Sequence, residues 1–134
     1  SAAELQRQEG NRLFSKGEWN LASECYQKAL AAEGKEAIAH LAHSNRSLCR
    51  YNMGHFDDAL HDAEKTIACK REWHKGWARK AAALDAKGMI EEALSAARQA
   101  LSLELGNPEY RKLANTLRSK LDASPPPTTK KKAA

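Results

Sequence analysis

The sequence predicts an all-α protein, a solenoid of three stacked helix pairs closed by one further helix. Three observations lead to this prediction. A short motif occurs three times, the apolar residues recur with helical spacing, and residues 1–107 contain no proline. The chain has 134 residues, which is enough for one domain with a useful core. No stretch alternates between apolar and polar residues, so no strand is expected.

The repeated motif reads glycine, any residue, a bulky apolar residue, two mostly polar residues and alanine. Its copies are Gly17–Ala22, Gly54–Ala59 and Gly88–Ala93, with glycines 37 and 34 residues apart (54 − 17 and 88 − 54). A period of this length, built from helix pairs, is typical of a stacked solenoid. The glycine marks the turn inside each pair, because it readily adopts the left-handed conformation that ends a helix.

The helices follow in order from this motif. We expect the first helices of the pairs to cover about 3–16, 37–53 and 74–87, and the second helices about 18–33, 56–70 and 90–103. The alanine of each motif falls where paired helices would cross closely, since a larger side chain would push them apart. Each second helix then carries an apolar face with spacings of three and four.

The last helix is predicted over about 107–122. Gly106 and Asn107 end the preceding helix, and Pro108 is favourable in the first turn of a new helix. Its apolar residues would cover the flank that the third pair leaves open, as a terminal cap does in a solenoid. These residues are Tyr110, Leu113, Leu117 and Leu121.

The predicted domain covers residues 1–122, with repeats at about 3–36, 40–73 and 74–107. Residues 123–134 are rich in proline and lysine and indicate an extended, unstructured linker. Because the chain begins with Ser1 rather than Met, we expect a module cut from a longer protein.

Charge and composition narrow the function classes. The net charge is +5, but three lysines lie at 130–132, so residues 1–122 carry only +2 (5 − 3). The folded part is therefore not a basic surface of the kind that binds nucleic acid. No signal peptide and no span of about 20 apolar residues is present, so no membrane partner is expected. Three dispersed cysteines indicate reduced thiols in a cytoplasmic or nuclear protein.

No residue pattern indicates an enzyme, a cofactor or a metal centre. The sequence has no glycine-rich phosphate loop and no elbow around a serine. His40, His43 and Cys49 lack the tight spacing of zinc ligands. The acidic pairs Asp57-Asp58 and Glu91-Glu92 lie at the start of second helices, where carboxylates interact favourably with the helix dipole. We therefore expect a non-enzymatic protein without catalytic or metal-binding residues.

Polar residues of the first helices predict a binding surface. Arg7 and Asn11 are four residues apart and share a helix face, as do Lys75 and Arg79, while Asn45 lies at the corresponding level of the middle pair. We expect these three cations and two amides to line one concavity, with no acidic residue among them. Such a set suits carboxylates, because amides donate without adding charge, lysine supplies a point charge and arginine a planar fork.

These segments resemble the dicarboxylate-clamp subclass of the tetratricopeptide repeat family. The resemblance covers about 3–122 and rests on the period, the turn glycine, the early alanine of each second helix and the segments Arg7–Asn11, Ser44–Ser47 and Trp73–Lys80. The chain departs from the family pattern in two ways: it has three extra residues around 37–39, and it lacks the proline that often ends a repeat. The resemblance implies a right-handed superhelix whose concave face is lined by the first helices.

The resemblance also implies a function. Members of the subclass bind the C-terminal Glu-Glu-Val-Asp tails of the cytosolic seventy- and ninety-kilodalton heat-shock chaperones. Their five clamp positions are usually Lys, Asn, Asn, Lys and Arg, and here correspond to Arg7, Asn11, Asn45, Lys75 and Arg79. The first three would hold the terminal carboxylate, the lysine would pair with the last Asp, and the last arginine would meet the backbone or an upstream acid.

Apolar groove positions one turn beyond the clamp residues would take the preceding Val and other aliphatic side chains. The candidates are Phe14, Leu48 and Ala82. We expect the domain to act as a monomeric co-chaperone adaptor in the cytoplasm or the nucleus.

Other interpretations stay open at this level. The domain could instead be a general scaffold that holds an internal segment of an unrelated partner. Lys75 and Arg79 alone could be an ordinary solvated helix face, and Asn11 and Asn45 could bond to neighbouring helices and brace the stack.

Overall fold

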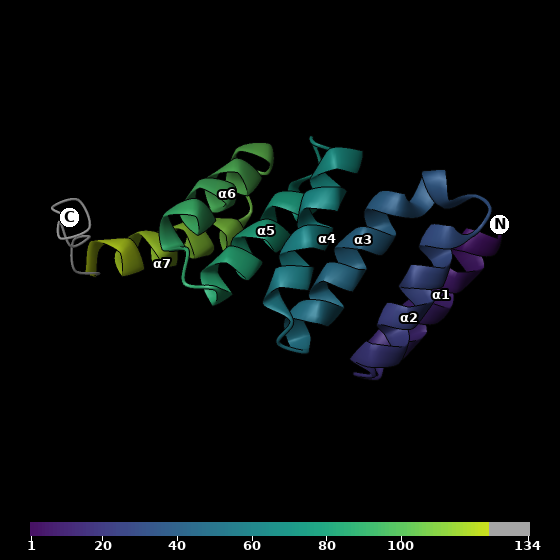
Figure 1. The fold of residues 1–134 in the computed structure, drawn as a ribbon. Coiled ribbons are helices and arrows are strands. Elements are labelled where there is room, and N and C mark those ends of the chain that lie inside the picture. The colour runs from purple at the N-terminus through teal and green to yellow at the C-terminus, as the bar shows by residue number, and fades with distance from the viewer. Residues whose placement is uncertain (124–134) are drawn as a thin grey trace, which may run out of the picture.

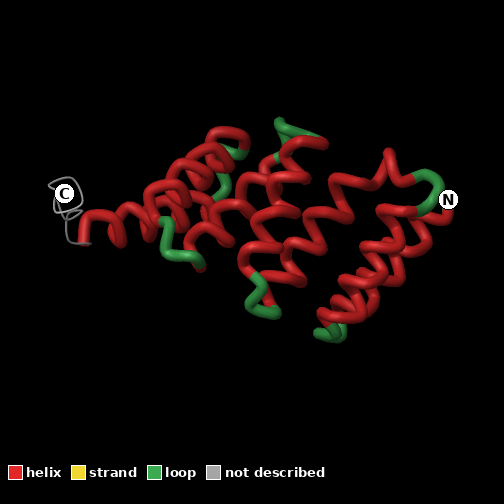
Figure 2. The backbone as a smooth tube through the Cα atoms, in the orientation of Figure 1, coloured by secondary structure: helices red, strands yellow, loops and turns green. Residues whose placement is uncertain are grey.

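The computed structural model describes residues 1–123, which form seven α-helices and no strand. In chain order these are α1 (Ala2–Ser15), α2 (Trp19–Ala31), α3 (Lys35–Asn52), α4 (Phe56–Cys69), α5 (His74–Ala86), α6 (Ile90–Leu103) and α7 (Pro108–Ala123). The helices stand side by side in chain order, with α1 and α7 at opposite ends (Figure 1), and only short turns join them (Figure 2). The predicted all-α solenoid is confirmed.

Each predicted helix is present, with its ends shifted by a few residues. The sequence placed Ala123 in the linker, whereas it is the last residue of α7. The rest of the predicted linker, 124–134, lies outside the described residues. In the part of the chain that the structure covers, no helix combines the length and apolarity needed to cross a membrane.

The same turn joins the two helices of every pair. Gly17, Gly54 and Gly88 have φ values of 78°, 82° and 81°. The residue after each glycine donates its N–H to the carbonyl five residues earlier, as His55 does to Arg50 at 2.8 Å. A Cβ on Gly54 would meet no atom within 4 Å, so the turn requires glycine for its backbone conformation and not for space.

The first helices form the inner row of the stack. α3 packs directly on both α1 and α5, whereas α4 makes no comparable contact with α2 or α6 within residues 1–123. Because the first helices approach one another more closely, the stack curves with α1, α3 and α5 on its concave side. The motif alanines Ala22, Ala59 and Ala93 are buried, which lets the paired helices cross closely.

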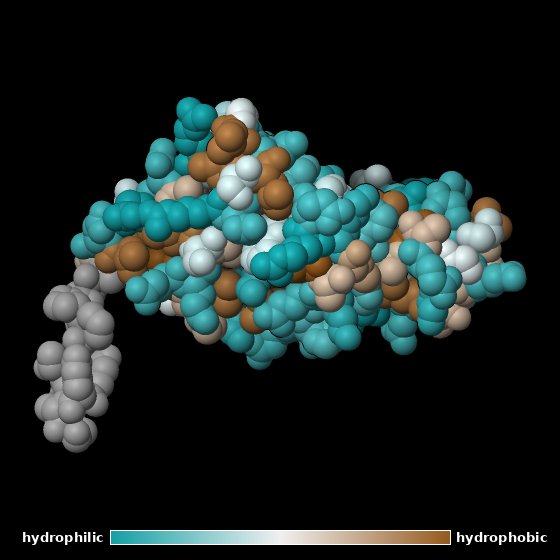
Figure 3. Space-filling model, turned by 90° about the horizontal axis from the view of Figure 1, so that it is seen from above, coloured by the Kyte–Doolittle hydropathy of each residue, from teal (hydrophilic) through white to brown (hydrophobic). Residues whose placement is uncertain are grey.

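The core is divided along the stack. One cluster surrounds Tyr26 and Cys49 in the first half, and another surrounds Leu84, Leu94 and Leu117 in the second half. α7 packs on α6 and buries Leu117 completely, as a capping helix should. On the face that Figure 3 shows, hydrophobic residues are visible only as separate patches among hydrophilic ones.

A buried ion cluster joins α3 to α4. Asp62 of α4 is fully buried and accepts hydrogen bonds from Arg46 at 2.9 Å and Arg50 at 2.7 Å, and bonds to His43 at 2.9 Å. Burial alone would raise the pKa of the Asp62 carboxyl, but the bonds from His43 and Arg46 and the two arginine charges outweigh it and hold the pKa below its usual value. The cluster fixes α3 against α4 and so helps to position Asn45, the neighbour of Arg46.

Replacing Asp62 by Asn should lower the free energy of unfolding by about 3 kcal/mol, because removing one partner of a buried ion pair leaves buried cations uncompensated. Urea unfolding measures the effect. The matched control is Asp58→Asn, an exposed carboxylate in the first turn of the same helix, which should cost about 0.5 kcal/mol. Equal small losses in the two variants would contradict the bracing role of Asp62.

Candidate functional site

The five predicted clamp residues come from the three inner helices. Arg7 and Asn11 lie on α1, Asn45 on α3, and Lys75 and Arg79 on α5. Lys75 is exposed and the other four side chains are partly buried. The two amides contact each other, and Arg79 contacts α3, so these three residues form a connected set across the inner row.

The amides of Asn11 and Asn45 are joined by a hydrogen bond between α1 and α3. Asn45 Nδ2 donates to Asn11 Oδ1 at 3.0 Å, and the Tyr26 hydroxyl donates to the same oxygen at 2.6 Å. Burial raises the pKa of the Tyr26 hydroxyl well above its usual value, so it remains a donor at neutral pH. With its oxygen held by two donors, Asn11 keeps an Nδ2 group for which residues 1–123 supply no acceptor. Asn11 therefore braces the stack and also retains free donors.

Tyr26 reaches Asn11 because Gly10 has no side chain. A Cβ at Gly10 would lie 2.6 Å from Cε1 of the fully buried Tyr26 ring. The tyrosine lies on an apolar helix face, and nothing in the sequence relates its hydroxyl to an amide 15 residues earlier.

Arg79 is a partly buried cation without an internal acid. Its Nε donates to the backbone carbonyl of Ser44 at 3.2 Å, which links α5 to α3. Burial lowers the pKa of the Arg79 guanidinium, but an arginine stays protonated at neutral pH. No carboxylate within the described range forms an ion pair with it. A partly desolvated cation in this state favours an external anion.

Lys75 extends the cationic surface along α5. Its Nζ lies 5.9 Å from the centroid of the Trp73 ring, and no acid of residues 1–123 pairs with it. The exposed side chain is free to follow a ligand. Two cations of one helix, Lys75 and Arg79, thus remain available to an anion.

None of the five clamp residues is acidic, but one of them has an acidic neighbour that the sequence analysis does not include. Glu4, one turn before Arg7 on α1, accepts two hydrogen bonds from its guanidinium, from Nε at 2.9 Å and from Nη2 at 2.6 Å. The i, i+3 spacing on one helix brings the two side chains together. Arg7 is therefore partly neutralised within the chain, unlike the two cations of α5.

The predicted apolar contacts Phe14, Leu48 and Ala82 are all partly buried on the inner helices. The Phe14 ring packs edge-on against Trp19, with ring centroids 4.9 Å apart, and joins the N-terminal core cluster. Part of its surface is therefore already used in packing.

Aromatic and histidine rings pack between α3, the start of α5 and α7, and Trp73 is the residue just before α5. Trp73 packs edge-on against His40 at 5.1 Å, and His74 Nδ1 shares a hydrogen bond of 2.5 Å with the Tyr110 hydroxyl. The second contact attaches the capping helix to α5. It joins residues 36 apart, and the sequence does not reveal it, because Tyr110 lies on the apolar face expected for the last helix.

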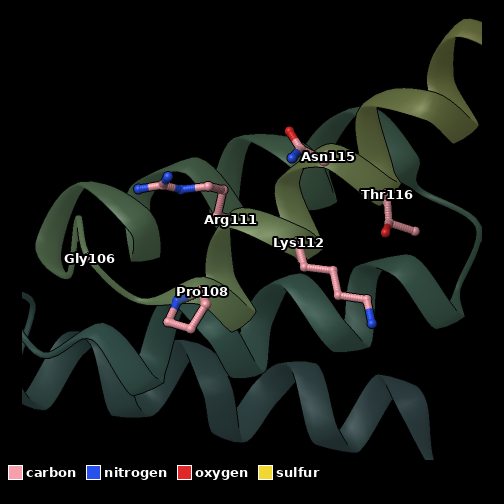
Figure 4. Close-up of a pocket in the computed structure, with 6 residues that line it drawn as sticks. All are labelled: Gly106, Pro108, Arg111, Lys112, Asn115 and Thr116. Atoms are coloured by element: carbon pink, nitrogen blue, oxygen red, sulfur yellow. The ribbon is translucent and has the colours of Figure 1, made fainter.

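A separate depression lies where α7 begins (Figure 4). It contains none of the clamp residues and is lined by residues of α7 and of the turn before it: Gly106, Pro108, Arg111, Lys112, Asn115 and Thr116. Among the described residues, no group of three or more histidine, cysteine or acidic side chains could hold a metal ion.

No model of a known protein family matches the chain. It is similar to the heat shock protein sti1 homolog of Schizosaccharomyces pombe, with 35% identity over 117 residues, which is 87% of this chain and 19% of that protein. Curated relatives of this kind are much longer, and the chain spans about a fifth of their length.

Two solved structures resemble the fold closely. The first TPR of Spaghetti (RPAP3) bound to the HSP90 peptide SRMEEVD superposes with a TM-score of 0.85 and 25% identity, covering 91% of this chain and 94% of that one. The second TPR domain of human RPAP3, in complex with the HSP70 peptide SGPTIEEVD, gives a TM-score of 0.78 and 25% identity over 87% and 98% of the two chains.

Replacing Tyr26 by Phe should lower the free energy of unfolding by about 1 kcal/mol, because one buried hydrogen bond to Asn11 is lost while the ring remains. Tyr51→Phe is the matched control, since Tyr51 is exposed and packs by its ring against Phe56. It should cost less than about 0.5 kcal/mol. Chemical unfolding of both variants measures the difference, and equal values would refute the role of the Tyr26 hydroxyl.

Proposed function

Because the chain is a tetratricopeptide repeat domain, we propose that it binds the acidic C-terminal tail of a heat-shock chaperone and serves as the recruiting module of a co-chaperone. The observation that carries the proposal is Arg79, a partly buried guanidinium without an acidic partner within residues 1–123. Lys75 and the joined amides of Asn11 and Asn45 belong to the same inner helices.

The comparisons support this choice of ligand. The two solved domains described above carry peptides ending in Glu-Glu-Val-Asp. Such a tail ends in two carboxylates, one of the main chain and one of the last Asp. Two carboxylates suit a groove that offers free amide donors and two cations without internal acids.

Each clamp residue has a role in the proposal. Arg7, Asn11 and Asn45 hold the terminal main-chain carboxylate, and the free Nδ2 of Asn11 supplies a donor for it. Lys75 pairs with the side chain of the last Asp, and Arg79 meets the peptide backbone or an upstream acid. The preceding Val contacts the apolar positions Phe14, Leu48 and Ala82.

The energetics are those of a moderate peptide complex. Charge-assisted hydrogen bonds contribute about 1.5–3 kcal/mol each. Several of them, less the cost of ordering a flexible tail, fit a dissociation constant of about 1 μM, or about −8 kcal/mol.

In this function residues 1–122 act as one binding unit of three repeats and a capping helix, without a catalytic role. It places the domain in the cytoplasm, where the chaperone tails are. All three cysteines are free thiols, which fits a reducing compartment.

Calorimetric titration with the peptide SRMEEVD tests the proposal. The free-acid peptide should bind, and the same peptide with an amidated C-terminus should bind at least about tenfold more weakly, because the amide removes the charge that the clamp holds. Lys75→Ala and Arg79→Ala should each weaken binding at least about tenfold, with folding checked by circular dichroism. Lys28→Ala, which changes an exposed lysine of α2, is the control and should change the affinity less than about twofold.

Equal binding of the amidated and free-acid peptides would refute the carboxylate clamp. The general scaffold would then be the better interpretation, since a groove that holds an internal segment is indifferent to a free C-terminus.

A further inference from the structure

Glu4 places a negative charge beside the proposed binding surface. We propose that Glu4 is an internal competitor of the ligand: in the free chain it occupies part of Arg7, and it thereby lowers the affinity for a terminal carboxylate. This inference rests on the proposed function, because it concerns the same surface.

Glu4 is held in place from several sides. Its backbone N–H is capped by the Ser1 hydroxyl at 3.1 Å, and its carboxylate accepts from Arg7 Nε and Nη2 and from Gln8 Nε2 at 3.0 Å. The hydrogen bond from Arg7 is the main reason that the pKa of Glu4 lies below its usual value. The carboxylate therefore stays ionised at neutral pH.

The ion pair with Glu4 leaves only some of the N–H donors of Arg7 available to a ligand. A guanidinium has five N–H donors, and Glu4 takes one from Nε and one from Nη2. Two donors on Nη1 and one on Nη2 remain, but the Nε–Nη2 edge, one of the edges that meet a carboxylate in two parallel bonds, is occupied. A ligand carboxylate at Arg7 must therefore either accept the remaining donors or displace Glu4, and in both cases it lies near a second negative charge.

The same helix contains a matched pair in a different environment. Arg12 donates to Glu9 at 3.0 and 2.5 Å with the same i, i+3 spacing. The side chains of that pair are 53% and 46% exposed, whereas those of Arg7 and Glu4 are 18% and 32% exposed. Solvent and salt screen the outer pair more strongly, so only the inner pair should influence a ligand in the groove.

The experiment compares Glu4→Gln with Glu9→Gln by calorimetric titration of the free-acid peptide SRMEEVD at several salt concentrations. Glu4→Gln should raise the affinity about threefold or more and make its salt dependence steeper, because the charge of Arg7 becomes available. Glu9→Gln removes the same charge from the same helix and should change the affinity less than about 1.5-fold. Glu4→Ala, which also removes the hydrogen-bond acceptor, should act in the same direction as Glu4→Gln. Thermal unfolding checks that all variants are folded.

The outcomes separate this inference from the function on which it rests. If the unaltered chain binds the peptide but Glu4→Gln binds equally or more weakly, Glu4 orients Arg7 and is not a competitor. An equal gain in Glu9→Gln would reduce the effect to overall charge and also overturn the inference. If the unaltered chain and both variants fail to bind, the proposed function is wrong and the inference falls with it.

Discussion

Hydrogen bonds between polar side chains and neighbouring inner helices set the geometry on which the proposed site depends. Asn45 donates to Asn11 between α3 and α1, and Arg79 donates to the Ser44 carbonyl between α5 and α3. In a solenoid each repeat contacts only its neighbours, so local contacts of this kind fix the spacing of the whole stack. Three of the five clamp residues therefore also hold the helices together. Their relative positions are set by the fold before any ligand arrives, which reduces the ordering cost of binding.

The cations on the two sides of α3 differ in whether they have an acidic partner. On the side facing α4, Arg46 and Arg50 surround the buried Asp62, and every charge has a partner. On the concave side, the bond of Arg79 goes to a neutral carbonyl, and this residue obtains no compensating charge within the described chain. Burying a cation without an acid destabilises a fold. The cluster around Asp62, in which both arginines bond to a carboxylate, provides rigidity next to a surface where Arg79 has no acidic partner within the described chain, which is the arrangement expected where an external anion completes the site.

Local rules made most of the fold predictable. The turn glycines specify a left-handed backbone and the motif alanines specify close crossings, and both constraints can be read within a few residues. The same kind of rule puts Lys75 and Arg79 on one face of a helix, since residues four apart share a face. It did not locate the partners of Asp62, which lie 12 to 19 residues away on another helix and depend on how α3 is rotated against α4. The Glu4–Arg7 pair can be predicted from the sequence, because a spacing of three residues is also a contact on one helix face.

The charges along the inner helices are unevenly distributed. Glu4 offsets Arg7 at the α1 end, while Lys75 and Arg79 concentrate uncompensated positive charge on α5. An acidic tail approaching from solution would be attracted first to the exposed Lys75, whose interaction is long-range and weakened by salt. Arg79, partly buried, would act only at short range and with less screening. Lys75 would thus attract the tail from a distance, and Arg79 would select it at short range. The uncharged amides at the contact between α1 and α3 would bind the carboxylate without adding to this long-range attraction.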